Sequence, residues 1–388
     1  MSTDSLCFVH ASDLHLEQSL YGIAEIPPAM RKILIDAPYA AAERVFDAAV
    51  DQQADFLLLT GDVLDPSRCG PRAIAFLYQQ FERLDEKGIA VYWLGGQIDP
   101  PQRWADSLVL PANVFVFALD STFTYERNGH PVAAIMQCSA SANSTTCRHS
   151  IAVGYEPNDP PSVDHLNVDF VALGGQHRHR VVSQSPLAQY AGSPQGRCPN
   201  ESGSHGCTLI RINETGVTTH RIETSAVHWH TERLTVPANA TTEDFENKLG
   251  DRMLNLLAAS GDRPLLVTWQ LDGAIQSCSP GHVKSLLTWL RNEFADGEPA
   301  AWTVAIHTDP NADWPESWYE EDTILGDYLR AIRDLQARGE DVFEFQSQIS
   351  QHQDADLAAA LSSTDDQDQF LRKASALGVQ LLRGDDHK

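Results

Sequence analysis

Acidic and histidine side chains directly follow strand-like apolar runs in this sequence. Asp13 and His15 follow the run LCFVHA, and Asp62 and Asp65 follow the run FLLLT. Residues two apart at the end of a strand point to the same side, so the side chains of Asp13 and His15 would lie together. A carboxylate beside an imidazole suits Mn, Fe or Zn better than Mg or Ca. The pattern therefore predicts a divalent-metal site.

Two later apolar runs also end in polar clusters. VYWL is followed by a glycine pair, Gln97 and Asp99, and DFVAL is followed by a segment that carries His177 and His179. Amide, carboxylate and imidazole groups all have atoms that can coordinate a metal ion. These four side chains are therefore candidates for the same site.

Helical patterns separate the first three runs. Apolar residues recur at three- and four-residue spacing over residues 41–50 and again over residues 74–84, as on one face of a helix. Strands that alternate with helices predict a largely parallel sheet. In such sheets, ligands bind outside the carboxyl ends of the strands. All four polar clusters fall at those ends.

The pattern changes near residue 225, which suggests three parts. Residues 1–225 are predicted to form the sheet domain, and residues 226–310 alternate helical and strand-like segments as a small α+β module. Residues 311–388 are predicted to form an acidic C-terminal helical region.

The charge is strongly negative and unevenly placed. The chain has 28 Lys and Arg against 53 Asp and Glu, a formal net charge of −25, and residues 301–368 contribute −13 of it with 3 basic and 16 acidic side chains. This argues against tight, unaided binding to nucleic acid, because that affinity comes from Lys and Arg that displace counterions from phosphates. A small substrate or a partner protein fits the charge better.

The remaining composition predicts a cytoplasmic protein. No run approaches 18 apolar residues, and the first residues lack a basic segment ahead of an apolar one, so we expect no membrane span and no secretion signal. The seven cysteines are scattered and never spaced as C-x-x-C, which predicts reduced thiols and no structural zinc site.

The order of the motifs resembles the calcineurin-like metallophosphoesterases. D-x-H is followed about fifty residues later by G-D-x-x-D, then by a glycine-rich strand end and a histidine-containing one. The chain is most similar to the SbcD-type DNA-repair exonucleases in FVHASDLHLEQSLYG, TGDVLD and GSPQGRCPNESGSHGCTL. This resemblance implies an α/β fold, a four-layer αββα sandwich followed by a small α+β capping domain and C-terminal helices.

The resemblance also implies a ligand set. In that family, two metal ions share one aspartate, and a hydroxide attacks phosphorus while both ions stabilise the developing charge. Matched motif by motif, the first metal would be held by Asp13, His15, Asp62 and His177. Asp62 would be the shared ligand, and Asp62 and His177 would act in catalysis as well as in metal binding.

The positions for the second metal differ from the family pattern. Gln97 stands where the family has an asparagine, Ile98 stands where it has a catalytic histidine, and Gly175 replaces the first histidine of the last motif. The histidine expected near residues 154–155 is also absent. An apolar side chain such as that of Ile98 can neither donate a proton nor hold charge. The sequence therefore favours one ion, most readily Mn, over two.

Several neighbouring residues have two interpretations. If the loop carries a two-residue insertion relative to the family motif, His177 and His179 would both bind metal. Without an insertion, the placement of the motif favours His177 as the ligand. Gln97 either coordinates a second metal weakly through its amide oxygen or takes no part. Asp65 and Asp99 are better explained as carboxylates that orient their loops, a common role for Asp in turns.

Two functions remain open. The first is a metal-dependent phosphoesterase related to the SbcD-type double-strand-break repair exonucleases, which would hydrolyse a DNA end or a smaller phosphodiester with a metal-activated water. Arg178 either contacts a substrate phosphate or lies in a solvated loop. The alternative is a catalytically weak or inactive SbcD-like subunit that docks a coiled-coil ATPase of the SbcC type. A homodimer is compatible with both.

Overall fold

The computed structural model describes most of the chain, in two units. The described residues are 5–103, 109–118, 121–139, 147–236, 241–273, 280–310, 314 and 316–338, and part of 371–382. The first unit comprises Met1–His230, Ser260–Leu266 and Ala295–Val304, and the second comprises Thr231–Ala259, Val267–Phe294 and Ala305–Lys388. The division at residues 225 and 310 stays a prediction, and much of the acidic stretch lies outside the described residues.

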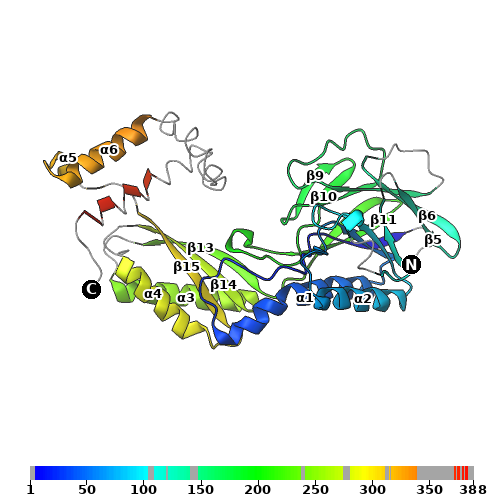
Figure 1. The fold of residues 1–388 in the computed structure, drawn as a ribbon, viewed down its shortest axis with the longest axis horizontal. Coiled ribbons are helices and arrows are strands. Elements are labelled where there is room, and N and C mark those ends of the chain that lie inside the picture. Colours follow the sequence, from blue (N-terminus) through cyan, green and yellow to red (C-terminus); the bar gives the residue numbers. More distant parts are fainter. Residues whose placement is uncertain are drawn as a thin grey trace. The chain divides into compact units, whose positions relative to one another are not determined.

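The first unit contains two six-stranded sheets (Figure 1). The order of the first sheet is β12-β11-β1-β2-β3-β4, with β1 to β4 parallel and β11 and β12 antiparallel at one edge. Its strands are β1 (Leu6–Ala11), β2 (Phe56–Thr60), β3 (Ala90–Leu94), β4 (Val114–Val116), β11 (Gly206–Asn213) and β12 (Gly216–Glu223).

The second sheet has the order β5-β6-β7-β8-β10-β9. Strands β6, β7, β8 and β10 run parallel, and an antiparallel strand lies at each edge. Its strands are β5 (Thr122–Arg127), β6 (His130–Gln137), β7 (His149–Tyr155), β8 (Phe170–Gly174), β9 (Arg180–Gln184) and β10 (Leu187–Tyr190).

Alternation along the central strands explains how the layers pack. In β1, Phe8 belongs to the apolar cluster shared by the two sheets, whereas its neighbour Val9 belongs to the cluster on the opposite face. Side chains alternate between the faces of a sheet, so a strand buried on both faces reads as one continuous apolar run. The outer face of the second sheet packs against apolar residues such as Val163 and Leu166 of the β7–β8 connection.

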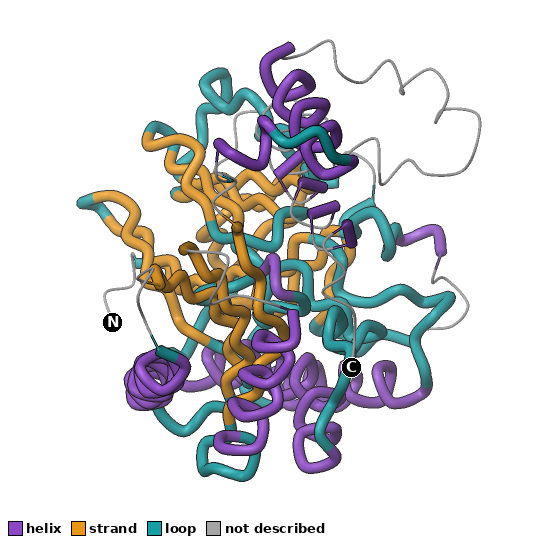
Figure 2. The backbone as a smooth tube through the Cα atoms, turned by 90° about the vertical axis from the view of Figure 1, so that its left-hand side faces the viewer, coloured by secondary structure: helices purple, strands orange, loops and turns teal. Residues whose placement is uncertain are grey.

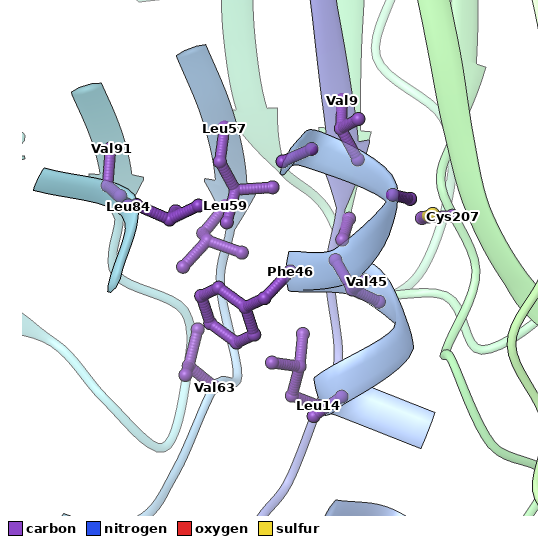
Figure 3. Close-up of a cluster of buried hydrophobic side chains, with 14 of the residues drawn as sticks. Val9, Leu14, Val45, Phe46, Leu57, Leu59, Val63, Leu84, Val91 and Cys207 are labelled. Carbon is purple, nitrogen blue, oxygen red and sulfur yellow. The ribbon is translucent and has the colours of Figure 1, made fainter. Parts of the chain in front are cut away.

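Two helices cover the outer face of the first sheet. These are α1 (Pro28–Asp51) and α2 (Pro71–Asp85), and the helical patterns predicted over 41–50 and 74–84 lie inside them. Figure 3 shows Val45 and Phe46 of α1 packed toward side chains of the neighbouring strands and of Val63. The predicted α/β class, with two large sheets and packed helices, is confirmed.

The later part of the chain adds a small sheet and the helices α3 to α6 (Figure 2). The sheet has the order β13-β14-β15, from β13 (His228–Val236), β14 (Leu265–Gly273) and β15 (Ala301–Pro310). The helices are α3 (Thr242–Ser260), α4 (Pro280–Phe294), α5 (Glu316–Glu320) and α6 (Ile324–Arg338). None of the helices that the structure describes has the length and apolarity needed to cross a membrane.

Candidate metal centre

Strand ends from both sheets meet at one place in the first unit. The chain leaves β1 at Ser12, leaves β2 at Gly61, and leaves β8 just after Gly174. A Cβ atom on Gly174 would lie 1.6 Å from the backbone oxygen of Thr60, so only glycine permits this approach of β8 to β2. The approach brings the loop that follows β8 to the loops that follow β1 and β2.

Three of the candidate residues have left-handed backbone conformations. Their φ angles are +56° at Asp13, +43° at His15 and +53° at Asp62. Such conformations cost a non-glycine residue about 1–3 kcal/mol each and concentrate at functional sites. Backbone hydrogen bonds hold them in place, because the Asp13 amide donates to Gly61 O at 2.9 Å and the His15 amide donates to Asp62 O at 3.0 Å.

The side chains of Asp13, His15 and His177 converge. One ligand atom from each lies within 4.8 Å of the others. His177 Nε2 is 4.0 Å from Asp13 Oδ1, and His15 Nε2 is 3.7 Å from Asp62 Oδ2. Both separations are too long for hydrogen bonds, but they suit atoms that each lie about 2.1 Å from one shared ion.

Two of these atoms are buried without a partner. Asp13 Oδ1 and His15 Nε2 have no hydrogen-bond partner within the described part of the chain. Buried polar atoms of this kind are costly, so they call for an explanation. Two imidazole nitrogens and a carboxylate oxygen match the ligands that Mn, Fe and Zn accept. The residues present therefore fit one such ion.

A carboxylate supports each histidine from behind. Glu17 Oε1 lies 3.2 Å from His15 Nδ1, and Glu201 Oε1 lies 2.6 Å from His177 Nδ1. When Nδ1 carries the proton and donates it to the carboxylate, the Nε2 lone pair faces the cluster, an arrangement common behind metal-bound histidines. Neither glutamate was among the residues predicted from the sequence.

Charge and hydrogen bonding keep these two glutamates ionised. Burial alone raises the pKa of Glu201, but its hydrogen bond with His177 and the backbone N–H of Arg197 outweigh burial and hold the pKa at about 2. Burial also raises the pKa of Glu17, and hydrogen bonds from His15 and the Asp65 backbone more than offset it, so the net shift is downward.

A buried arginine anchors the loop that follows β1. Arg197 is 1% exposed, and its Nη2 donates to the backbone oxygens of Asp13 at 2.7 Å and Leu14 at 2.9 Å. The Asp13 side chain is fixed separately, because its Oδ2 accepts hydrogen bonds from Ser12 Oγ and the Gly175 amide. Burial raises the pKa of Asp13, although His177 opposes that rise. A bound cation would favour the ionised carboxylate.

Asp99 organises the loops that follow β2 and β3. Asp99 is fully buried and accepts hydrogen bonds from the amides of Asp62, Val63 and Gly96 and from the indole of Trp93. Burial raises the pKa of Asp99 to about 6, against the effect of these amides.

The Asp65 carboxylate caps the turn that follows it. Its Oδ1 accepts hydrogen bonds from both the amide and the hydroxyl of Ser67. The backbone amide of Asp65 donates in turn to Glu17, so this turn is tied to the carboxylate behind His15.

Three other candidates lie outside the cluster. Gln97 is exposed, and Arg178 is exposed and donates to Asn200 O at 2.7 Å. His179 is half-buried, and burial together with the charge of Arg221 lowers its pKa. The structure therefore brings His177, and not His179, to Asp13 and His15.

Tyr155 occupies the position at the end of β7 where the resemblance implied a histidine. Its hydroxyl donates to Asp62 Oδ2 at 2.7 Å. The sequence showed only that no histidine was present there. It gave no sign of this contact, which joins residues 93 positions apart.

Known proteins match this chain over much of its length. Residues 7–178 match the model of the calcineurin-like phosphoesterase family. The chain is 28% identical over 343 residues to the uncharacterized metallophosphoesterase YhaO of Bacillus subtilis (strain 168), across 79% of this chain and 82% of that protein. It is 20% identical over 275 residues to the DNA double-strand break repair protein Mre11 of Thermoplasma acidophilum, across 61% and 71%. These matches support placing residues 7–178, within the first unit, in the calcineurin-like metallophosphoesterase superfamily.

Proposed function

We propose that this protein is a divalent-metal-dependent phosphodiesterase whose ion is held by Asp13, His15, Asp62 and His177. The observation that carries the proposal is the pair of histidines, each supported by a carboxylate and each directing Nε2 toward Asp13 or Asp62. The chemistry supplied by a bound divalent ion is polarisation of a phosphoryl oxygen and acidification of water. Mn is the preferred ion, with Fe or Zn as alternatives and one ion rather than two.

The protein's own residues would contribute mainly by positioning. Glu17 and Glu201 would accept the Nδ1 proton of the two imidazoles, which fixes their tautomer and orients Nε2 toward the ion. Asp99 holds the loop that carries Asp62 through the backbone amides of Asp62 and Val63. At position 98, isoleucine offers no proton to a leaving group, so that proton would come from solvent. Substrates with good leaving groups should therefore react fastest.

For the natural substrate, we propose a DNA end or a smaller phosphodiester, as in an enzyme of the SbcD type. The similarity to an Mre11 protein supports the first choice. The net charge of −25 supports the smaller phosphodiester. If DNA is the substrate, the same charge favours a basic partner protein that helps to hold it. A cytoplasmic location and a homodimer stay predictions.

A catalytically weak subunit that docks an SbcC-type ATPase is the second candidate. Ile98 favours it, because the side chain at that position lacks a transferable proton, and so does the acidity of residues 301–368. Such a protein would keep the fold and the ion while hydrolysing phosphodiesters little or not at all.

Hydrolysis of bis-(p-nitrophenyl) phosphate with added Mn separates the two candidates. The wild type should hydrolyse it, Asp62→Asn should reduce the rate to background, and Asp164→Asn should match the wild type because Asp164 is an exposed aspartate outside the cluster. Equal, near-zero rates for the wild type and Asp62→Asn would refute the enzyme and leave the docking subunit.

A further inference from the structure

Each carboxylate oxygen of Asp62 accepts a hydrogen bond from within the protein. Its Oδ2 accepts the hydroxyl of Tyr155 at 2.7 Å, and its Oδ1 accepts the amide of Ile98 at 3.0 Å. Asp13 Oδ1 and His15 Nε2, by contrast, have no such partner in the described chain. The two sides of the site therefore differ in how their polar atoms are satisfied.

The Tyr155 ring is packed against the glycines of two loops. A Cβ atom on Gly61 would lie 2.4 Å from Tyr155 Cδ2, and a Cβ atom on Gly96 would lie 2.7 Å from Tyr155 Cε2 and 2.4 Å from Asp62 Oδ1. Both glycines leave room that the ring fills, so little space remains beside Asp62 on this side. The hydroxyl is held in position by the packing of the ring as well as by its hydrogen bond.

The residues around Tyr155 do not fit a second metal ion. Gln97 is exposed, and Ile98 has an apolar side chain. Gly175 has no side chain, its amide already donates to Asp13 Oδ2, and its φ of +100° disfavours any residue with a Cβ atom. The groups directed at Asp62 are an O–H and an N–H, which present partial positive charge to the carboxylate, as a cation would.

We propose that Tyr155 takes the place of a second metal ion beside Asp62: its ring fills the space, its hydroxyl donates to Oδ2, and the site holds a single ion. Tyr155 is then a positioning residue for Asp62. This inference rests on the proposed function, since it assumes that Asp62 and the cluster around His15 hold the first ion.

Counting the Mn ions bound per chain tests the proposal. The wild type should bind one ion, and Tyr155→Phe should also bind one, because the ring remains and only the hydroxyl is lost. Tyr155→His combined with Gln97→Asn replaces the ring with ligand groups, so this variant should bind two. Electron paramagnetic resonance adds a readout independent of activity, because two Mn ions roughly 4 Å apart couple magnetically and a single ion does not.

A control variant and a test of folding separate a change in ion binding from a general effect of the substitution. Tyr125 donates to Asp55 Oδ1 at 2.9 Å, so Tyr125→Phe removes another tyrosine–aspartate hydrogen bond and should leave the ion count at one. Circular dichroism establishes that each variant is folded before ions are counted. If the Tyr155→His/Gln97→Asn variant does not fold, the counts for the wild type and Tyr155→Phe still decide.

The contrary outcomes differ for the two proposals. Two coupled ions in the wild type or in Tyr155→Phe would overturn the inference and the single-ion count but leave the metal-dependent phosphodiesterase activity standing. A single ion in the folded Tyr155→His/Gln97→Asn variant would overturn the inference alone. A wild type that binds no ion would overturn the proposed function itself.

Discussion

The polar groups around Asp62 lie on the same strand-end loops but differ in whether they have hydrogen-bond partners within the protein. On one side, Asp13, His15 and His177 direct unpartnered or weakly paired atoms at a common point. On the other side, Tyr155 and the Ile98 amide satisfy the carboxylate within the protein. Buried polar atoms without protein partners call for an ion to satisfy them, whereas polar atoms already paired within the protein do not.

Replacing a histidine on the ion side should have the largest effect. His177→Ala should weaken Mn binding by more than about 100-fold, since the loss of a direct ligand should exceed the 10–100-fold typical of residues behind the ligands. His179→Ala is the matched control and should leave the affinity unchanged. Titration calorimetry measures both, and a larger loss for His179→Ala would reverse the assignment of the two histidines.

Removing the negative charge of Glu201, which lies behind His177, should lower the affinity for Mn by less than removing His177 itself. Glu201→Gln keeps the shape of the side chain but weakens the hydrogen bond to Nδ1, so Mn affinity should fall by about 10–100-fold. Glu214→Gln alters an exposed glutamate that pairs with Arg148 and should change nothing. Equal affinities for the two variants would mean that Glu201 does not support the ion.

Replacing a glycine that contacts the Tyr155 ring tests how closely that ring is packed. Gly61→Ala places a methyl group against the ring at a φ of +91°, whereas Gly129→Ala meets open space at a φ of +76°. Backbone strain of about 1–2 kcal/mol is common to both, and the clash adds to it only at Gly61. Urea unfolding should show the larger loss for Gly61→Ala, and equal losses would contradict a closely packed ring.

The pH dependence of stability tests the buried carboxylate that holds the Asp62 loop. Burial raises the pKa of Asp99 to about 6 from its ordinary value near 3.9. The folded state therefore binds this proton more tightly, and the resulting stability is present below about pH 4 and lost as the pH rises through about 6. In the ion-free protein, the free energy of unfolding should fall over this range relative to that of Asp99→Asn. A constant difference would refute the shift.

Local patterns made the framework predictable. The apolar runs of β1 and β2 and the helical spacing in α1 reflect burial on defined faces, which the sequence displays directly. Asp13 and His15 were predictable as site residues because they follow a strand, but their side chains are oriented by left-handed backbone conformations beyond β1 and not by strand alternation. Membership of the wider superfamily also followed from the order of the motifs.

The support behind the ligands was not predictable, because it depends on distant segments. Glu201 lies 24 residues from His177, and Arg197 lies 184 residues from Asp13, so only the packed sheets bring them together. The sequence showed that the histidine expected near Tyr155 was absent. It could not show the contact of Tyr155 with Asp62, because that contact depends on how the ring fits between two loops. Glu17, two residues after His15, was the one supporting residue with a local signal.

We propose that Asp62 contacts one ion and that Tyr155 takes the place of a second. Anomalous diffraction from crystals of the Mn-loaded wild type tests it most directly. We expect one anomalous peak, bounded by Asp13, His15 and His177, with the Tyr155 hydroxyl still hydrogen-bonded to Asp62. A second peak between Tyr155 and Asp62, or no peak among the three ligands, would contradict it.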